Sequence, residues 1–510
     1  MVAVKFRCLC RVTETSPKVD WFIFSLGAAL LSLVVLPIVV FPEASQALID
    51  QAFRFITREL GVLYVALATS ILVFLIYAAA GPWGHIRLGV GDVRYSQFSW
   101  ISMLFCCGIG GSVIYWGASE WVFYYVAPPF SAEPESDVAT LWATTYGMFH
   151  WGPVGWALYC LPTLAISCAY YLGRSPSLRL SAACEAGLGR FQSKGLRRFI
   201  DLLFIVGLLG TAATGLGFGT AVATSALTRL AGIPDNFSTQ LALIAVITVL
   251  ISISVYRGLD DGIKTLSNIN SVLALVLLAC VFVLGPTLFI AETSLAALGH
   301  GLQHFIQMLT WTDPLGRDQF VENWTVFYWA WWLALGPFVG MFVCKISEGR
   351  TVRELITGML LWGSLGCALF FMILGNFSLN LELTGQMNVV EESQTMSPSY
   401  ALSHAVTYLP GASLWLIFVA VIGTIFTATT YDSAAYTLAA GATQKLAPGQ
   451  HPERWHRVFW ALALGTLPAS LLYLGSLRAL QTATIVASVP LLVIYVILMI
   501  SVTRTLRSAS

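Results

Sequence analysis

Charged side chains are scarce in this chain. Lys and Arg supply 27 of its 510 residues and Asp and Glu supply 26, whereas 57% of the residues are hydrophobic. A soluble protein of this length needs far more charge, because charged residues make up about a quarter of an average soluble chain. The composition therefore excludes an ordinary soluble protein and indicates a polytopic membrane protein.

Sequence features of several other functions are also missing. The formal net charge is +1 with no basic cluster, so we expect no nucleic-acid partner, since phosphate binding needs concentrated Lys and Arg. The ten cysteines form no CxxC or Cys/His metal spacing and fall mostly inside apolar runs, which indicates small buried hydrophobes. We find no HExxH motif, phosphate loop or nucleophile elbow, and we therefore expect neither an enzyme nor a bound organic cofactor.

Long apolar runs are abundant instead. A helix needs roughly 20 apolar residues to cross the hydrocarbon, and this rule predicts an all-α membrane protein with twelve spans. The predicted spans are 21–41, 60–82, 97–120, 141–173, 198–225, 237–257, 265–290, 323–345, 352–376, 412–441, 457–478 and 482–503. An even number of spans puts both termini on one side of the lipid bilayer.

The basic residues predict which side that is. The loop between the fourth and fifth predicted spans is rich in basic residues, whereas 121–150 and 377–411 contain none. The basic residues of the loop are Arg174, Arg179, Arg190, Lys194, Arg197 and Arg198. Because Lys and Arg accumulate in cytoplasmic loops, we expect both termini to be cytoplasmic in a multi-pass protein of the cell (inner) membrane.

Two predicted spans contain residues that a lipid-facing helix avoids. In span three, Gly108, Gly110 and Gly111 occupy three of four positions, and each Gly weakens a helix by about 1 kcal/mol. In span eight, Gly336-Pro337 removes an amide donor and kinks or opens the turn. Paired breaks in corresponding helices point to a transport site, although the glycines could instead only let helices pack closely.

The two breaks also suggest an internal repeat. They lie 228 residues apart (336 minus 108), close to the offset between the starts of their spans, so spans three to seven and eight to twelve can be two five-helix repeats. Between them, Leu295, Leu298 and Leu302 recur at helical spacing, which predicts an amphipathic helix along the outer interface. The predicted division is therefore 1–96 with two leading helices, 97–290 as first repeat, 291–322 as interfacial helix and 323–510 as second repeat.

Aromatic residues cluster near the break in span eight. Trp331 and Trp332 come just before Gly336, and span four contains Trp151, Trp156 and Tyr159. Converging aromatic faces bind a cation that lacks hydrogen-bond donors, such as a quaternary ammonium, at roughly 0.5–2 kcal/mol per contact. Any one of these residues could instead belong to an interfacial belt or to packing, but as a group they predict an onium-binding box.

These residues carry a resemblance to a known family. The run WTVFYWAWWLALGPFVGMFVCKISEGRTVRE at 324–354 closely resembles the signature of the betaine/choline/carnitine transporter family, and the likeness extends over nearly the whole chain, including 117–130 and 150–153. The resemblance implies a twelve-helix secondary transporter with two inverted five-helix repeats after two leading helices. It also implies a homotrimer that works by alternating access.

The resemblance assigns a small-molecule onium substrate and a set of residues that bind it. By position, the family's aromatic box corresponds to Trp151, Trp156, Tyr159, Trp331 and Trp332, and a further box position, usually Trp or Tyr, is Leu335 here. The family's glycine-rich segment, whose amides approach the substrate carboxylate, corresponds to Gly108, Gly110 and Ser112. Choline-selective members typically carry Asp at the position of Ser112. The serine therefore favours a zwitterion such as glycine betaine, carnitine or a sulfonium analogue.

The resemblance also implies the coupling ion. Sodium-coupled members place hydroxyl residues at the positions of Thr429 and Thr430, with backbone oxygens corresponding to Cys106, Ile109 and Phe426. Sodium-independent antiporting members lose these hydroxyls and bear an arginine near the position of Asn270. We therefore expect sodium-coupled uptake.

Other ways of driving transport remain open. Hydroxyls in span ten could simply bond the carbonyl one turn back, which would leave a sodium-independent antiporter as the alternative. Asp432 is an acid inside the same span, and an intramembrane acid could serve a proton-coupled symporter.

Overall fold

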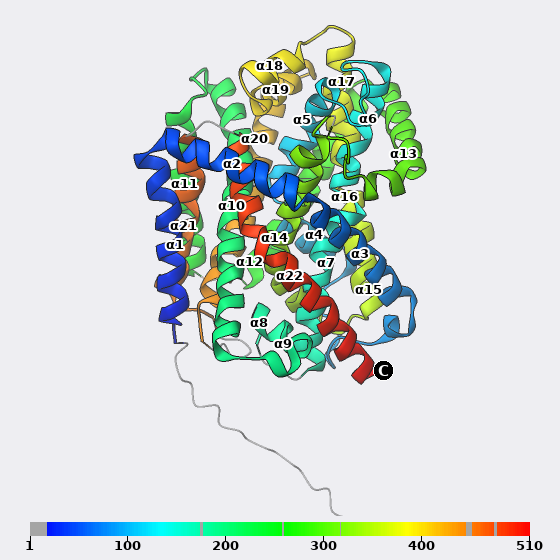
Figure 1. Ribbon diagram of the computed structural model, residues 1–510. Coiled ribbons are helices and arrows are strands. Elements are labelled where there is room, and N and C mark those ends of the chain that lie inside the picture. The colour runs from blue at the N-terminus through cyan, green and yellow to red at the C-terminus, as the bar shows by residue number, and fades with distance from the viewer. Residues whose placement is uncertain (1–17, 174–176, 258–259, 317, 445–450, 474–476) are drawn as a thin grey trace, which may run out of the picture.

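The computed structural model in Figure 1 describes residues 18–173, 177–257, 260–316, 318–444, 451–473 and 477–510. Within these ranges every named element is a helix, and strand-like pairing is limited to two isolated bridges, Val19 with Thr443 and Arg87 with Thr351. The all-helical prediction is therefore confirmed for the described residues. Arg174 of the predicted basic loop lies outside them.

Helices occupy the positions that the apolar runs predict. They are α1 (Trp21–Val40), α3 (Gly61–Ala80), α4 (Gln97–Ile109), α5 (Ser112–Val126), α6 (Asp137–His150), α7 (Pro153–Ser167), α10 (Lys194–Ala231), α11 (Phe237–Arg257), α12 (Asp260–Leu284), α14 (Val326–Ile346), α20 (Ala412–Gly441), α21 (Arg454–Tyr473) and α22 (Leu477–Ala509). The predicted ninth span is built from α15 (Val352–Thr357), α16 (Gly363–Phe370) and α17 (Asn376–Leu383), joined by two π-helical turns.

Membrane-length helices are numerous. In the described part of the chain, nine helices are long and apolar enough to cross a membrane, or ten if the bent pair α4 and α5 counts as one span. Helices α11 and α21 stand at the two other predicted positions. The count of twelve and the division into two inverted repeats stay predictions.

Several shorter helices cover the ends of the bundle (Figure 1). Helix α2 (Pro42–Glu59), which the apolar runs did not reveal, runs across the outside of the bundle, and α18 (Val389–Thr395) and α19 (Pro398–Ala405) lie at one end. Helices α8 (Leu180–Ala183) and α9 (Glu185–Leu188) lie at the other end. Helix α13 (Thr287–Thr310) occupies the first part of the segment predicted as an amphipathic helix, and it exposes Leu295 and Leu302 and buries Leu309. The interfacial position of 291–322 stays a prediction.

The predicted break in span three is confirmed. Helices α4 and α5 meet at an angle of 61° around Gly110 and Gly111. Gly110 has φ +60°, in the left-handed region where a side chain is strained. A Cβ on Gly110 would also lie 2.7 Å from the hydroxyl oxygen of Thr430. The bend therefore depends on glycine both for its backbone conformation and for its close approach to α20.

The predicted break in span eight is wrong, because α14 runs through Gly336-Pro337 without interruption. Pro337 has no N–H, so the carbonyl of Leu333 loses its partner within the helix. The hydroxyl of Tyr495 on α22 donates to this carbonyl at 2.8 Å. A Cβ on Gly336 would lie only 2.1 Å from the Tyr495 oxygen. The Gly-Pro pair therefore docks α22 against α14 and does not open the helix.

We expect Tyr495→Phe to destabilise the protein by about 1–3 kcal/mol, because the buried Leu333 carbonyl would lose its donor. The midpoint of thermal unfolding in detergent measures the effect. Tyr473→Phe is a matched control, because Tyr473 is 54% exposed and its midpoint should not change. Equal midpoints for the wild type and Tyr495→Phe would contradict the docking role.

Candidate functional site

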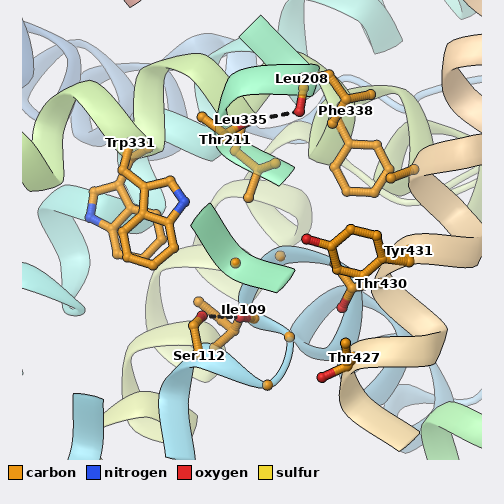
Figure 2. Close-up of a pocket in the computed structure, with 16 residues that line it drawn as sticks. Ile109, Ser112, Leu208, Thr211, Trp331, Leu335, Phe338, Thr427, Thr430 and Tyr431 are labelled. Carbon is orange, nitrogen blue, oxygen red and sulfur yellow. Dashed lines mark hydrogen bonds between the residues drawn. The ribbon is translucent and has the colours of Figure 1, made fainter. Parts of the chain in front are cut away.

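A cavity lies inside the bundle at the bend between α4 and α5 (Figure 2). Its other walls come from α10, α14 and α20. The lining residues are Gly108, Ile109, Gly110, Gly111, Ser112, Leu208, Thr211, Gly215, Trp331, Trp332, Leu335, Phe338, Thr427, Thr430, Tyr431 and Ala434. The volume open to the centre of a water molecule is about 20 Å³, which is room for about one water. A larger ligand can enter only if the walls separate.

The bend frees the last carbonyls of α4, and side-chain hydroxyls from three helices bind them. The hydrogen bonds are Tyr159 Oη to Gly108 O at 2.9 Å, Ser112 Oγ to Ile109 O at 2.7 Å and Thr430 Oγ1 to Cys106 O at 3.1 Å. A carbonyl left without a donor at this depth would cost about 1–3 kcal/mol. The break is therefore held by α5, α7 and α20 together.

Helix α5 begins at the cavity with an uncapped first turn. Its N-cap residue is Gly111, which has no side chain, and no side-chain cap of this helix is found in the described part of the chain. The hydroxyl of Ser112 is already used on the carbonyl of Ile109. Because the start of a helix carries partial positive charge, the cavity presents backbone amides to an anionic group.

Two stacked indoles form the opposite side of the cavity. The rings of Trp331 and Trp332 have centroids 5.4 Å apart and an interplanar angle of 8°. Figure 2 shows Trp331 across the cavity from Thr430 and Tyr431. Trp332 donates its N–H to the carbonyl of His150 at 2.9 Å. This bond fixes its ring, so the pair presents an ordered aromatic surface.

The three other predicted box residues lie behind this pair. Trp151 and Tyr159 contact Trp332 edge-on, with centroid distances of 4.9 and 5.2 Å, and Trp156 contacts Tyr159 at 5.6 Å. Each of the five rings is at most 2% exposed. The structure therefore gathers the predicted rings into one cluster, in which Trp331 and Trp332 line the cavity. Leu335, the further box position that the family resemblance implies, also lines it.

Glu120 on α5 is a site residue that the sequence analysis missed. Its carboxylate is fully buried and accepts hydrogen bonds from the hydroxyls of Tyr124 and Tyr328, both at 2.5 Å, and from the indole N–H of Trp151 at 2.9 Å. The His150 ring lies 3.6 Å away. Glu120 therefore links α5 to α14 and fixes the orientation of Trp151. The position of an acidic residue at the edge of a predicted span could have identified Glu120 from the sequence.

The oxygens predicted to bind sodium are partly assembled. The hydroxyl of Thr430 lies 3.1 Å from Cys106 O and 3.0 Å from Phe426 O. These three oxygens meet where α20 touches the end of α4. Thr429 instead donates to carbonyls of its own helix at 2.9 and 3.0 Å, which is the ordinary behaviour of an intramembrane threonine. Ile109 O accepts from Ser112, as described above.

Asn270 on α12 lies beside the thiol of Cys106. It is fully buried and interacts with that thiol, and no other hydrogen-bond partner of its Oδ1 or Nδ2 is found among the described residues. An unbound amide in such surroundings costs free energy, and its oxygen is a further acceptor beside Cys106. Asp432 is also buried but does not line the cavity.

A family model described as BCCT, betaine/carnitine/choline family transporter, matches residues 22–510. The chain belongs to this family. The resemblance carried by 324–354 is therefore confirmed.

Individual BCCT relatives match over most of their length. An uncharacterized transporter of Escherichia coli strain K12, YeaV, is 35% identical over 83% of this chain and 88% of the relative. A carnitine transporter of Acinetobacter baumannii is 34% identical over 84% of this chain and 78% of the relative. The glycine betaine transporter OpuD of Bacillus subtilis strain 168 is 32% identical over 96% and 94%.

Among solved structures, a Na⁺-coupled sialic acid symporter in a substrate-bound outward-open state is similar to this BCCT chain. The TM-score is 0.44, the sequence identity is 14%, and the match covers 85% of each chain.

We expect Glu120→Gln to destabilise this BCCT protein by about 1.5–3 kcal/mol, because hydrogen bonds to an ionised acceptor are stronger than those to an amide. The substitution should lower the thermal midpoint and change the near-ultraviolet circular dichroism of the tryptophan cluster. Glu133→Gln, on an exposed loop, is the matched control. If both variants gave the wild-type spectrum and midpoint, Glu120 would not orient the cluster.

Proposed function

We propose that this BCCT protein takes up a zwitterionic onium compound, such as glycine betaine, carnitine or a sulfonium analogue, together with sodium. One observation supports the proposal most directly. The stacked rings of Trp331 and Trp332 line the same cavity as the uncapped start of α5. A methylated cation suits the indole faces, and a carboxylate suits the helix amides. The names of the similar carnitine and glycine betaine transporters support this substrate class.

The small cavity fits a transporter that changes shape. A volume of about 20 Å³ for water centres is too small for any of these solutes. We propose that the substrate binds a conformation in which the α4–α5 bend and α14 lie further apart. Alternation between closed and open conformations is then the transport cycle, and each ligand acts through its differential affinity for them.

We propose that sodium binds at the junction of α4 and α20. The oxygens of Cys106, Phe426 and Thr430 meet there, and hard cations prefer such oxygen ligands. The Oδ1 of the buried Asn270, beside Cys106, would add a fourth oxygen to the set. A sodium ion at this junction would hold α20 against the α4–α5 bend. The other side of the same bend lines the cavity. Sodium and substrate would then favour the same conformation, which is the physical basis of coupling.

We also propose a membrane orientation and an assembly. Helices α8 and α9, which belong to the basic segment, lie at the same end of the bundle as the start of α1 and the end of α22 (Figure 1). Positive loops prefer the cytoplasm, which supports cytoplasmic termini in the cell inner membrane. The family resemblance supports a homotrimer, and crosslinking in native membranes followed by mass measurement tests it.

Uptake into proteoliposomes tests the substrate. We expect labelled glycine betaine or carnitine to enter, with choline entering far less, and we expect Trp332→Ala to weaken apparent affinity about tenfold. The loss of one aromatic contact is worth roughly 0.5–2 kcal/mol, and 1.4 kcal/mol corresponds to a tenfold change. Trp21→Ala is the control, because Trp21 is 61% exposed. Unchanged onium uptake by Trp332→Ala would disprove the box.

The matched pair Thr430→Val and Thr429→Val tests the ion site. Thr430 bridges α20 to α4, whereas the observed bonds of Thr429 stay within α20. We expect Thr430→Val to raise the sodium concentration for half-maximal uptake about tenfold, because one oxygen ligand is lost, and Thr429→Val to change it less.

Three outcomes of this experiment have different meanings. If both variants raised the sodium concentration for half-maximal uptake equally, both hydroxyl oxygens would be sodium ligands. Counterflow without any ion gradient, with no effect of either variant, would indicate a sodium-independent antiporter. Uptake driven by a proton gradient alone would indicate a proton-coupled symporter.

A further inference from the structure

A second pocket lies outside the bundle core, where the N-terminal ends of α4 and α15 meet. It is lined by Gln97, Arg350, Glu354, Thr357, Leu361 and Trp362, and it offers about 160 Å³ to water centres. The transport cavity described above does not share any of these residues. Helix α15 lies toward the end of the bundle that contains the start of α1 and the end of α22 (Figure 1).

Arg350 is a buried cation with unused capacity. The residue is 5% exposed, and its guanidinium lies 4.1 Å above the centre of the Trp100 ring. Its two terminal nitrogens donate to Gln97 Oε1 at 3.0 Å and to Tyr95 O at 3.4 Å. Its Nε has no hydrogen-bond partner, and it forms no ion pair, among the residues that the structure describes. A guanidinium fixed in this way is preorganised to bind anionic oxygens.

Glu354 supplies the opposite charge in the same pocket. Its Oε2 accepts from the backbone N–H of Thr351 at 2.7 Å and from the Thr351 hydroxyl at 3.0 Å, in the capping box that begins α15. Both bonds use the same oxygen, and the side chain is exposed. A pocket with one cation and one anion that do not pair closely is complementary to a molecule with both charges, and the carboxylate would disfavour a simple anion.

The pocket opens beside apolar surface. Leu361 and Trp362, on the turn of helix that follows Glu354, are 60% and 39% exposed. Phe98, next to Gln97, is 48% exposed. Leu361 and Trp362 lie within the candidate span Val352–Leu383, where exposed apolar side chains contact lipid. The polar part of the pocket therefore adjoins a place for an acyl chain.

We propose that this pocket binds a zwitterion whose anionic oxygens meet Arg350 and whose cationic group meets Glu354. Two sources share this chemistry, namely the headgroup of an ethanolamine phospholipid and a free zwitterionic solute. The exposed Leu361 and Trp362 favour the lipid. The lipid case is independent of the transport activity proposed above, because it needs neither the tryptophan pair nor the α4–α5 bend.

Lipid binding to the delipidated, full-length protein tests this inference. Dioleoylphosphatidylethanolamine or dioleoylphosphatidylglycerol is added back in detergent, and native mass spectrometry counts the lipids retained per chain. We expect the wild type to prefer the ethanolamine lipid and Arg350→Gln to bind it about tenfold more weakly, since a charge-assisted contact is lost. Glu354→Gln keeps a capping-box side chain and should abolish the preference over phosphatidylglycerol.

Arg353→Gln is the matched control, because Arg353 donates to Ala79 O at 2.8 Å and does not line the pocket. Displacement of the lipid by glycine betaine would support the zwitterion site and identify a free solute as a competing source. Equal retention of both lipids by the wild type, or an unchanged preference in Glu354→Gln, would overturn the inference. The test with Glu354→Gln remains valid even if Arg350→Gln does not fold. Neither of these two outcomes depends on a transport measurement.

Discussion

The backbone groups freed at the α4–α5 bend are the constraint on which the rest of the site depends. Inside a membrane no water is available to bind them, so the protein must supply each partner. It does so with hydroxyls from neighbouring helices, of which Tyr159 and Thr430 come from α7 and α20. These same partners place an aromatic cluster on one side of the bend and an oxygen set on the other. One local break thus brings the proposed substrate and ion sites together.

The same requirement has the opposite result in α14. Pro337 also frees a carbonyl, but Tyr495 reaches it from α22 and the helix stays continuous. The difference lies in backbone conformation, because Gly110 adopts a left-handed φ that a helix cannot continue, whereas proline keeps a helical φ and loses only one hydrogen bond. A proline in a span is therefore weaker reason to expect a break than a run of glycines.

Two buried charges in the structure are stabilised in different ways. Glu120 is surrounded by hydroxyl and indole donors deep in the bundle, so its charge serves to hold Trp151 and α14 in place. Arg350 lies near a helix end, stacked on Trp100, with a donor to spare. A charge with satisfied hydrogen-bonding capacity organises its neighbours, whereas one with unused capacity can bind a ligand.

The sequence by itself determined the membrane class, the positions of the helices that coincide with long apolar runs, the bend at Gly110 and the family, because apolar length, backbone preference and a contiguous motif are local properties. Tertiary structure alone decided that Trp331 and Trp332 line the cavity, that Thr430 and not Thr429 reaches α4, and that Tyr495 closes α14. Each of these results depends on contacts between residues far apart in the chain, and helical periodicity does not specify which face meets which neighbour.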